Sequence, residues 1–291
     1  MVAPSETRAH VPQTESRNFL RFAECEEYRR VNRELLEEVF PHLPSIFFQV
    51  DVASGTGLVP QEMAKLCKLR GKRGRIIGVE PDHFAVEKAR QILIVSGVTS
   101  YELVEGYGQD LEELLKGRIP EEGVDYVSIH DAIHEIEGIE DKRLVLGAMA
   151  RSIKPEGLLS MNSAFTSVAQ TRPWGELKLD VLKNDGLKRN KLVERETRAI
   201  DTLTPQQYRE LLEEQGLIII HDVLKIVTLS RKALEGISIY PKFVEGFFRD
   251  VESQDRIDDD KKTEMLVESL ERRGVQQIDR VWHELIGRKA A

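Results

Sequence analysis

The chain is poor in cysteine, in long apolar runs and in excess positive charge. Its two cysteines, Cys25 and Cys67, are not spaced as metal ligands, which argues against a zinc module and a disulfide framework and favours a reducing compartment. No run of eighteen apolar residues occurs, so we expect no membrane span. Acidic residues outnumber basic ones by 50 to 42, and this net charge of −8 argues against a protein that wraps nucleic-acid backbone.

The composition is otherwise that of a globular protein with a packed core. Of the 291 residues, 41% are hydrophobic and 32% are charged, which fits one large domain or one domain with insertions. Residues 1–17 are polar and lack the apolar segment of a signal peptide. We therefore expect a disordered tail at 1–17 and a cytoplasmic protein.

The most informative stretch is residues 47–57, FFQVDVASGTG, in which an apolar run ends in an acidic residue and a small-residue turn. A helix is predicted at 58–69, and a second apolar run at 75–79 ends in Glu80. A strand, a tight turn, a helix and an acid-tipped strand form a nucleotide-binding βαβ unit. Small residues let the backbone approach a ligand closely, and Glu80 is placed to accept hydrogen bonds from two ribose hydroxyls. An ordinary α/β turn without a ligand fits the downstream elements less well.

The glycine spacing separates two classes of nucleotide site. A dinucleotide fingerprint requires Gly-x-Gly-x-x-Gly, and reading from Gly55 places Pro60 where the third glycine belongs. The stretch from Asp51 to Gly57 instead resembles the first motif of the class I S-adenosylmethionine-dependent methyltransferases, which has an acid, a hydrophobic residue and a small-x-Gly-x-Gly turn. Ala53 departs from the glycine that the family usually carries at its position.

This resemblance covers roughly residues 45–229 and the last ten or so. It implies an α/β fold with a Rossmann-like, doubly wound, mostly parallel seven-stranded sheet, an antiparallel last strand and helical inserts. It also implies S-adenosyl-L-methionine as the cofactor and S-adenosyl-L-homocysteine as the product. Asp51 would lie near the cationic amino or sulfonium group, although a turn-capping carboxylate is the alternative role. The expected cofactor-binding residues are Asp51, Ala53, Ser54, Gly55, Gly57, Glu80, Pro81, Gly108, Gln109, Asp110 and His130.

The adenine side of the site departs from the family's pattern. After its third strand, expected here at 101–105, the family often carries an acid beside the adenine amino group. Tyr107 stands at that position in this chain. Gln109 or Asp110 could reach the adenine edge instead, and Tyr107 could stack on the base.

The rest of the sequence alternates between helical and strand patterns. Apolar residues from Phe19 to Phe40 recur at helical spacing, and Pro41 and Pro44 end that segment. Further helices are expected at 83–95, 110–115, 142–153 and from 205 to a stop at Gly216, with Asp82 and Thr204 as caps. Further strands are expected at 101–105, 124–129, 158–161, 217–227 with a bulge, and 279–288, and a turn is expected at 154–157.

Two segments fall outside this alternation. Residues 171–200 are predicted to form a helical insert over the site, and residues 231–274 a second helical insert in the hairpin of the last two strands. The aromatic side chains of these inserts are predicted to line a partly apolar acceptor pocket. They are Trp174, Tyr240, Phe243, Phe247 and Phe248.

The expected organisation therefore has seven segments. They are a disordered tail (1–17), an N-terminal helical cover (18–44), the cofactor-binding core (45–170), the insert over the site (171–200), a helix with the sixth strand (201–230), the second insert (231–274) and the closing strand (275–291). Many small-molecule methyltransferases cover the cofactor with such a leading segment. Packing on the core is the other role that the leading helix could have, and both can hold together.

Residues 130–136, HDAIHEI, place titratable side chains at the carboxyl end of the fourth strand, where α/β proteins bind ligands. His134 matches a histidine that small-molecule methyltransferases carry there, which implies a base for a substrate hydroxyl. Asp131 is three residues away, so a helical turn would place both on one face, with Asp131 orienting His134 or binding the acceptor. His130 would contact the methionine moiety of the cofactor, either with its side chain or through its backbone alone. A packing role for His134 and a metal held by both histidines are the alternatives, and we expect no metal.

These features imply a biosynthetic enzyme that methylates a small, partly apolar organic acceptor, with oxygen or carbon favoured as the methylated atom. Because the sulfonium is already activated, alignment supplies most of the rate and a base is optional. A cyclase that uses only the sulfonium charge and a protein that only senses the cofactor are alternatives, and the polar side chains at 130–135 argue against the second. The signature of amino-directed base methylation does not follow the fourth strand, so we expect no nucleic-acid partner. A monomer and a homodimer both fit the sequence.

Overall fold

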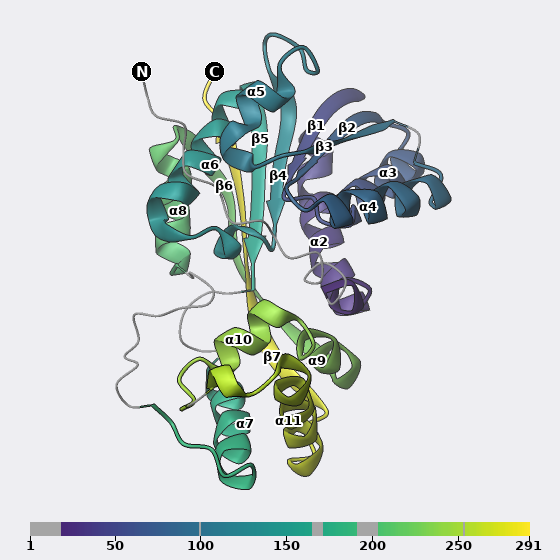
Figure 1. Cartoon of the computed structure of the whole chain (residues 1–291). Helices are drawn as coiled ribbons and strands as arrows, with labels where there is room; N and C mark the ends of the chain where they lie inside the picture. The colour runs from purple at the N-terminus through teal and green to yellow at the C-terminus, as the bar shows by residue number, and fades with distance from the viewer. Residues whose placement is uncertain (1–18, 99, 165–170, 191–202, 253) are drawn as a thin grey trace.

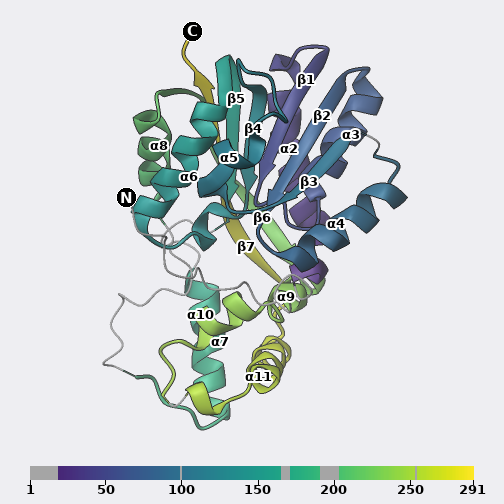
Figure 2. The ribbon, with the colours of Figure 1, turned by 45° about the horizontal axis from the view of Figure 1, so that its top comes forward.

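The computed structural model describes residues 19–98, 100–164, 171–190, 203–252 and 254–291. Its centre is a seven-stranded sheet of order β3-β2-β1-β4-β5-β7-β6, in which the first five strands are parallel and β7 runs antiparallel to β5 and β6 (Figures 1 and 2). The strands are β1 (Ile46–Val52), β2 (Arg73–Glu80), β3 (Tyr101–Glu105), β4 (Val124–His130), β5 (Ile153–Ser163), β6 (Leu217–Ser230) and β7 (Gln277–Lys289). The predicted Rossmann-like sheet with an antiparallel last strand is therefore confirmed.

Helices cover both faces of the sheet. On one face lie α2 (Glu26–Val39), α3 (Leu58–Arg70) and α4 (His83–Val95), and on the other lie α5 (Leu111–Leu115), α6 (Gly138–Ser152) and α8 (Pro205–Glu214) (Figure 1). The alternation of side chains along β1 explains this burial on both faces. Phe47 belongs to the core beneath α2 and α3, whereas Val50 and Val52 belong to the core beneath α6.

A helical lobe lies beyond one end of the sheet (Figure 1). The connection between β6 and β7 forms α9 (Arg231–Ile237), α10 (Pro241–Phe248), a 3₁₀ turn (Gln254–Arg256) and α11 (Asp259–Arg272), which confirms a helical insert there. The lobe has its own core, which includes Leu177, Phe248, Leu266 and Trp282. α7 (Thr171–Asn184) packs beside α10 and α11 and is part of this lobe.

The helix predicted from Phe19 to Phe40 is interrupted. Residues 19–23 are helical, but Cys25 has extended backbone (φ −72°, ψ 138°), and α2 begins at Glu26. The interruption lets Phe19 pack against Tyr28 and against Tyr240 of the lobe. A helical pattern alone could not predict it, because these tertiary contacts outweigh local propensity.

Two further boundaries differ from the predictions. The turn predicted at 154–157 is an irregularity within β5, where Glu156 has a left-handed backbone (φ 63°) and the register with β4 shifts. Pro155 lacks a backbone N–H and is tolerated at such a bulge. The helix predicted at 142–153 begins four residues earlier, at Gly138, and ends at Ser152.

The local stop and start signals were reliable. Asp82 caps α4 by accepting a hydrogen bond from the Phe84 N–H, and Thr204 forms a capping box with Gln207 at the start of α8. No helix in the described ranges is long and apolar enough to cross a membrane. The predicted tail at 1–17 and residues 191–200 of the first insert lie outside the described residues.

Candidate active site

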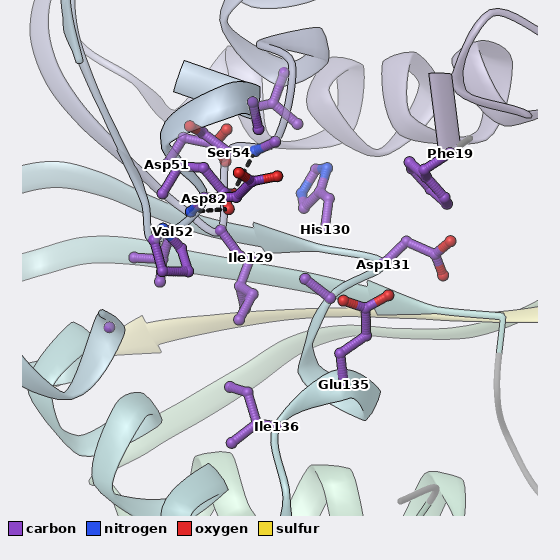
Figure 3. A pocket seen from close by; sticks show the side chains of 18 of the residues that line it. Phe19, Asp51, Val52, Ser54, Asp82, Ile129, His130, Asp131, Glu135 and Ile136 are labelled. Atoms are coloured by element: carbon purple, nitrogen blue, oxygen red, sulfur yellow. Dashed lines mark hydrogen bonds between the residues drawn. The ribbon is translucent and has the colours of Figure 1, made fainter. Parts of the chain in front are cut away.

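A cavity of about 490 Å³ opens at the carboxyl ends of β1, β2 and β4. Strand order reverses between β1 and β4, and open α/β sheets bind ligands at such a switch point. The volume is within the usual range for small-molecule sites. Residues of the N-terminal segment, among them Phe19, and Tyr240 and Lys242 at the start of α10 also line the cavity. Figure 3 shows Phe19 on the side opposite Asp51.

The turn after β1 has the backbone of a close-approach loop. Ala53, Gly55 and Gly57 all adopt positive φ, at 53°, 52° and 84°. Ala53 and Gly55 line the cavity with Ser54. An alanine with this backbone costs about 1–2 kcal/mol, so the departure from the family's glycine is a local strain at the site.

Gly57 has a structural role that corrects its predicted contact with the cofactor. It does not line the cavity, and it caps α3 in the left-handed conformation. A Cβ at this position would meet Ala89 and Leu93 of α4 at 3.4 Å. The left-handed backbone, and not crowding, therefore accounts for glycine at position 57, while the cavity lining continues with Thr56 and Leu58.

Glu80 organises the turn from the tip of β2. Its Oε2 accepts a hydrogen bond from the Gly55 N–H at 2.8 Å, and its Oε1 accepts one from the Asp82 N–H at 3.0 Å. Burial raises the pKa of this carboxyl to about 7, and the two N–H donors oppose that rise. Each carboxylate oxygen can accept a second hydrogen bond, so Glu80 can bind a ligand while it holds the loop.

Asp51 lacks a partner for one of its oxygens. Oδ1 accepts a hydrogen bond from Ser128 Oγ at 2.6 Å, but Oδ2 is buried and has no hydrogen-bond partner in the described part of the chain. Burial raises the pKa of Asp51 to about 7, and the Glu80 carboxyl also raises it. A buried carboxylate that lines a cavity in this way is suited to a cationic hydrogen-bond donor.

The Asp51 carboxyl predicts a pH-dependent change in stability. The pKa of Asp51 is higher in the folded protein than in the unfolded chain. Between about pH 4 and about pH 7 the unfolded chain has lost this proton while the folded protein still holds it, so the ligand-free protein loses stability as pH rises through that range. Asp51→Asn removes this loss. Thermal unfolding should therefore find the variant relatively more stable at pH 8 than at pH 5, and a difference in Tm that does not change with pH would contradict this.

His130 presents its ring to the cavity, not only its backbone. Nε2 lies 2.8 Å from Ser160 Oγ, which lies 2.5 Å from the Tyr126 hydroxyl. Nδ1 is buried and has no hydrogen-bond partner in the described ranges. Burial lowers the pKa of His130 to about 3, so the ring is neutral near pH 7. Figure 3 shows the ring between Asp51 and Asp131.

Asp131 is held in a strained conformation beside the cavity. Its φ is 51°, its N–H donates to Asn162 Oδ1 at 2.8 Å, and its Oδ1 accepts from the Ala164 N–H at 2.9 Å. Burial raises the pKa of Asp131 to about 7, although the Ala164 N–H and the buried Arg280 guanidinium lower it. Strain that surrounding bonds hold in place is common at functional sites.

His134 lies outside the cavity, which corrects its predicted role as a base. It is 2% exposed and its Nδ1 lies 3.1 Å from Ser163 Oγ. The segment Ile133–Glu135 is a 3₁₀ turn, and Asp131 precedes it with a left-handed backbone, so the two side chains do not share a helical face. The alternative packing role is the one that the geometry supports.

His134→Gln is therefore expected to lower the free energy of unfolding by about 1–3 kcal/mol, because the residue is fully buried. The pH dependence of kcat should not change, because no proton transfer uses this ring. Chemical denaturation and a pH–rate profile test the two parts separately. Loss of a titrating limb from the rate profile, with stability unchanged, would restore the role as a base.

The segment after β3 forms part of the cavity wall. Tyr107, Gly108 and Gln109 line the cavity, and so does Pro81 after β2. A Cβ on Gly108 would come within 2.9 Å of side chains of Val52 and Val145, so only glycine fits. Asp110 does not line the cavity and instead ends the 3₁₀ turn Gly108–Asp110 before α5, which corrects its predicted contact.

The inserts contribute less to the cavity than predicted. Of their five aromatic residues, Tyr240 lines it, and the others pack within the lobe, as in the 4.8 Å contact between the rings of Trp174 and Phe243. Lys242 of α10 also lines the cavity, whereas no residue at 173–190 does. The first insert was predicted to cover the site. Its described part instead packs against α10 and α11 of the lobe.

The N-terminal segment was predicted as a cover, but none of its residues was predicted to line the site. Phe19, Ala23, Tyr28 and Asn32 line the cavity, and Asn32 also accepts a hydrogen bond from Asn162 Nδ2 at 3.0 Å. An asparagine on the buried stripe of a helix was the available signal, because buried amides need partners. Among the described residues, no three His, Cys, Asp or Glu side chains are grouped to hold a metal ion.

The family model described as "Methyltransferase domain" matches residues 49–216, which is more than half of the chain. No curated protein matches the sequence.

Solved structures share the fold at low sequence identity. A putative sarcosine dimethylglycine methyltransferase from Galdieria sulphuraria is 14% identical, with a TM-score of 0.52 over 90% of this chain and 86% of that chain. The [4+2]-cyclase SpnF is 15% identical, with a TM-score of 0.53 over 91% and 81% of the two chains. A Haemonchus contortus phosphoethanolamine N-methyltransferase 2, in complex with phosphomonomethylethanolamine and S-adenosylhomocysteine, is 12% identical, with a TM-score of 0.55 over 96% and 58%.

Proposed function

The chain belongs to the family of S-adenosylmethionine-dependent methyltransferases, and we propose that its acceptor is a small molecule bound at the β4 end of the cavity. One observation carries the proposal. A single cavity joins the acid-tipped cofactor turn, with Asp51 and Glu80, to the polar side chains His130 and Asp131. Such a cavity can hold a methyl donor and an acceptor in contact.

The residues at the β1 and β2 ends fit the cofactor. Glu80 would accept hydrogen bonds from the ribose hydroxyls, and the unpartnered Oδ2 of Asp51 would accept one from the amino group of the methionine moiety. Tyr107, Gly108 and Gln109 would border the adenine. When bound, S-adenosylmethionine supplies a methyl group activated by its sulfonium.

The residues at the β4 end would position the acceptor. Asn32 and Asp131 offer polar contacts, and the ring of Phe19 closes the side opposite Asp51 (Figure 3). Alignment in an enclosed cavity supplies most of the rate for such a reaction. Asp131, whose pKa is raised to about 7, replaces His134 as the group that can take a proton from the acceptor.

The alternative function is that of a cyclase that binds S-adenosylmethionine without transferring its methyl group, because the [4+2]-cyclase SpnF shares the fold. Product analysis separates the two activities. The protein is incubated with S-adenosylmethionine carrying a deuterated methyl group and with a small-molecule extract, and the products are analysed by mass spectrometry. We expect S-adenosylhomocysteine together with the label on a low-mass compound. Bound cofactor without S-adenosylhomocysteine, or a label confined to macromolecules, would contradict the proposal.

A further inference from the structure

Three aromatic rings gather at the acceptor end of the cavity. Phe19 lies at 5.6 Å from Tyr28 and at 5.1 Å from Tyr240, measured between ring centroids, and all three residues line the cavity. They come from the N-terminal segment, from α2 and from the residue before α10, so three separate parts of the chain converge here. Aromatic faces attract cations, and groups of rings are used to bind quaternary ammonium ligands.

Carboxylates line the same end. Asp131 and Glu135 line the cavity, and Figure 3 shows both on the far side of His130 from Asp51. Burial and then the charges of Asp131 and Glu135 raise the pKa of the Tyr28 hydroxyl well above its ordinary value, so this phenol stays neutral among the acids. The rings and the acids therefore form one environment.

The cations in this region do not balance that negative charge. Lys242 lies 3.4 Å from Glu135 in an ion pair, and the Tyr240 hydroxyl donates to the same carboxylate at 2.5 Å. Among the described residues, Arg280 is the cation that lowers the pKa of Asp131, and its guanidinium is buried in β7 and does not line the cavity. The carboxylates that line the cavity therefore outnumber its lining cations, and Lys242 is the lysine or arginine of the described residues that lines it.

His130 gives an independent sign of a polar ligand. His130 lines the cavity, its Nδ1 is buried and has no hydrogen-bond partner in the described ranges, and its Nε2 lies 2.8 Å from Ser160 Oγ. Buried polar atoms in native proteins are nearly always partnered. An atom of this kind between the cofactor turn and Asp131 marks the place where a polar atom of the acceptor belongs.

We propose that the acceptor is a small aliphatic amine, held by its basic nitrogen between Asp131 and the rings of Phe19, Tyr28 and Tyr240. The proposal rests on the function proposed above and names its substrate class. It replaces the oxygen or carbon acceptor that the sequence favoured, because an acidic, ring-lined end suits a cation better than a neutral apolar group.

The chemistry balances with the groups present. The amine arrives as an ammonium ion, and the Asp131 carboxylate takes one N–H proton. The lone pair of the neutral nitrogen then forms the bond to the methyl carbon while the carbon–sulfur bond breaks, and that bond's electron pair stays on sulfur. The product is a methylated ammonium ion, which the same rings and carboxylate can hold.

A matched pair of probes tests the amine site. Protein saturated with S-adenosylhomocysteine is titrated in a calorimeter with choline and with 3,3-dimethylbutan-1-ol, its neutral isostere. We expect choline to bind about 10-fold more tightly, because only the cation gains from the rings and the acid. Asp131→Asn should weaken choline binding about 10-fold and leave the alcohol unchanged, because asparagine tolerates the left-handed backbone of this position.

The neutral alcohol reports whether the cavity of each variant is intact. Phe19→Leu should also lower the ratio of the two affinities, whereas Glu105→Gln, which removes an exposed carboxylate outside the cavity, should not. Equal affinities in the unchanged protein, or no saturable choline binding, would overturn the amine proposal while the methyltransferase function stands. Failure to bind S-adenosylhomocysteine at the start would instead overturn the proposed function, and the amine proposal with it.

Discussion

Glu80→Gln is expected to weaken the binding of S-adenosylmethionine about 100-fold. The carboxylate would accept hydrogen bonds from the ribose, and such bonds to a charged group contribute about 1.5–3 kcal/mol each. It also accepts the Gly55 and Asp82 N–H groups, so an amide would leave one of these donors facing an N–H₂ group. The loss should therefore combine a direct contact with a disturbed turn, and isothermal titration calorimetry measures it.

The adjacent strand offers a matched control. Glu105 is the register partner of Glu80 at the tip of β3, but it is exposed, pairs with His83 and does not line the cavity. Glu105→Gln should leave cofactor affinity within about 2-fold, because exposed ion pairs contribute little. Equal affinities for the two variants would reject the role of Glu80 in ribose binding.

Asp131→Asn is expected to lower kcat about 100-fold, which is the lower end of the range for loss of a general base. The substrate for this assay is the acceptor identified from the labelled extract. In the unchanged enzyme the rate should rise as pH passes through about 7, where this carboxyl loses its proton. The groups around it are Arg280 of β7, Glu135 after β4 and Tyr28 of α2, and Lys242 of α10 pairs with Glu135. Asparagine has the same shape as aspartate, so the substitution should leave these neighbouring groups in place.

The limb near pH 7 should disappear in the variant, while cofactor affinity stays unchanged. Full pH–rate profiles at saturating acceptor separate these effects from weaker acceptor binding. If the variant keeps both its rate and the limb near pH 7, Asp131 does not accept the proton. Alignment of donor and acceptor would then account for catalysis.

Sequence reasoning succeeded where the signals are local. The small-residue turn at 53–57, the cap at Asp82 and the capping box at Thr204 each involve neighbours in the chain, and the predicted bounds of α4 and β3 match the structure. The acid at the tip of β2 was found for the same reason. It ends an apolar run, and parallel strands in this fold bring their carboxyl ends to one edge.

The errors lie where backbone irregularity or tertiary packing decides. A left-handed Asp131 followed by a 3₁₀ turn directs its neighbour His134 into the core, and no sequence pattern specifies that backbone. The break at Cys25 follows from contacts between Phe19 and Tyr240, which are over two hundred residues apart. Aromatic residues of the inserts were assigned to the acceptor pocket, but a separate lobe needs its own core, and most of them fill it.

One cavity is expected to hold the cofactor at Glu80 and to direct its methyl group toward Asp131. A crystal structure of the complex with S-adenosylhomocysteine tests this most directly. We expect both ribose hydroxyls within hydrogen-bond distance of the Glu80 carboxylate and the sulfur on the His130 side of the ribose, with Asp131 beyond it. A complex in which the ribose lies away from Glu80, or in which the sulfur faces away from Asp131, would contradict it.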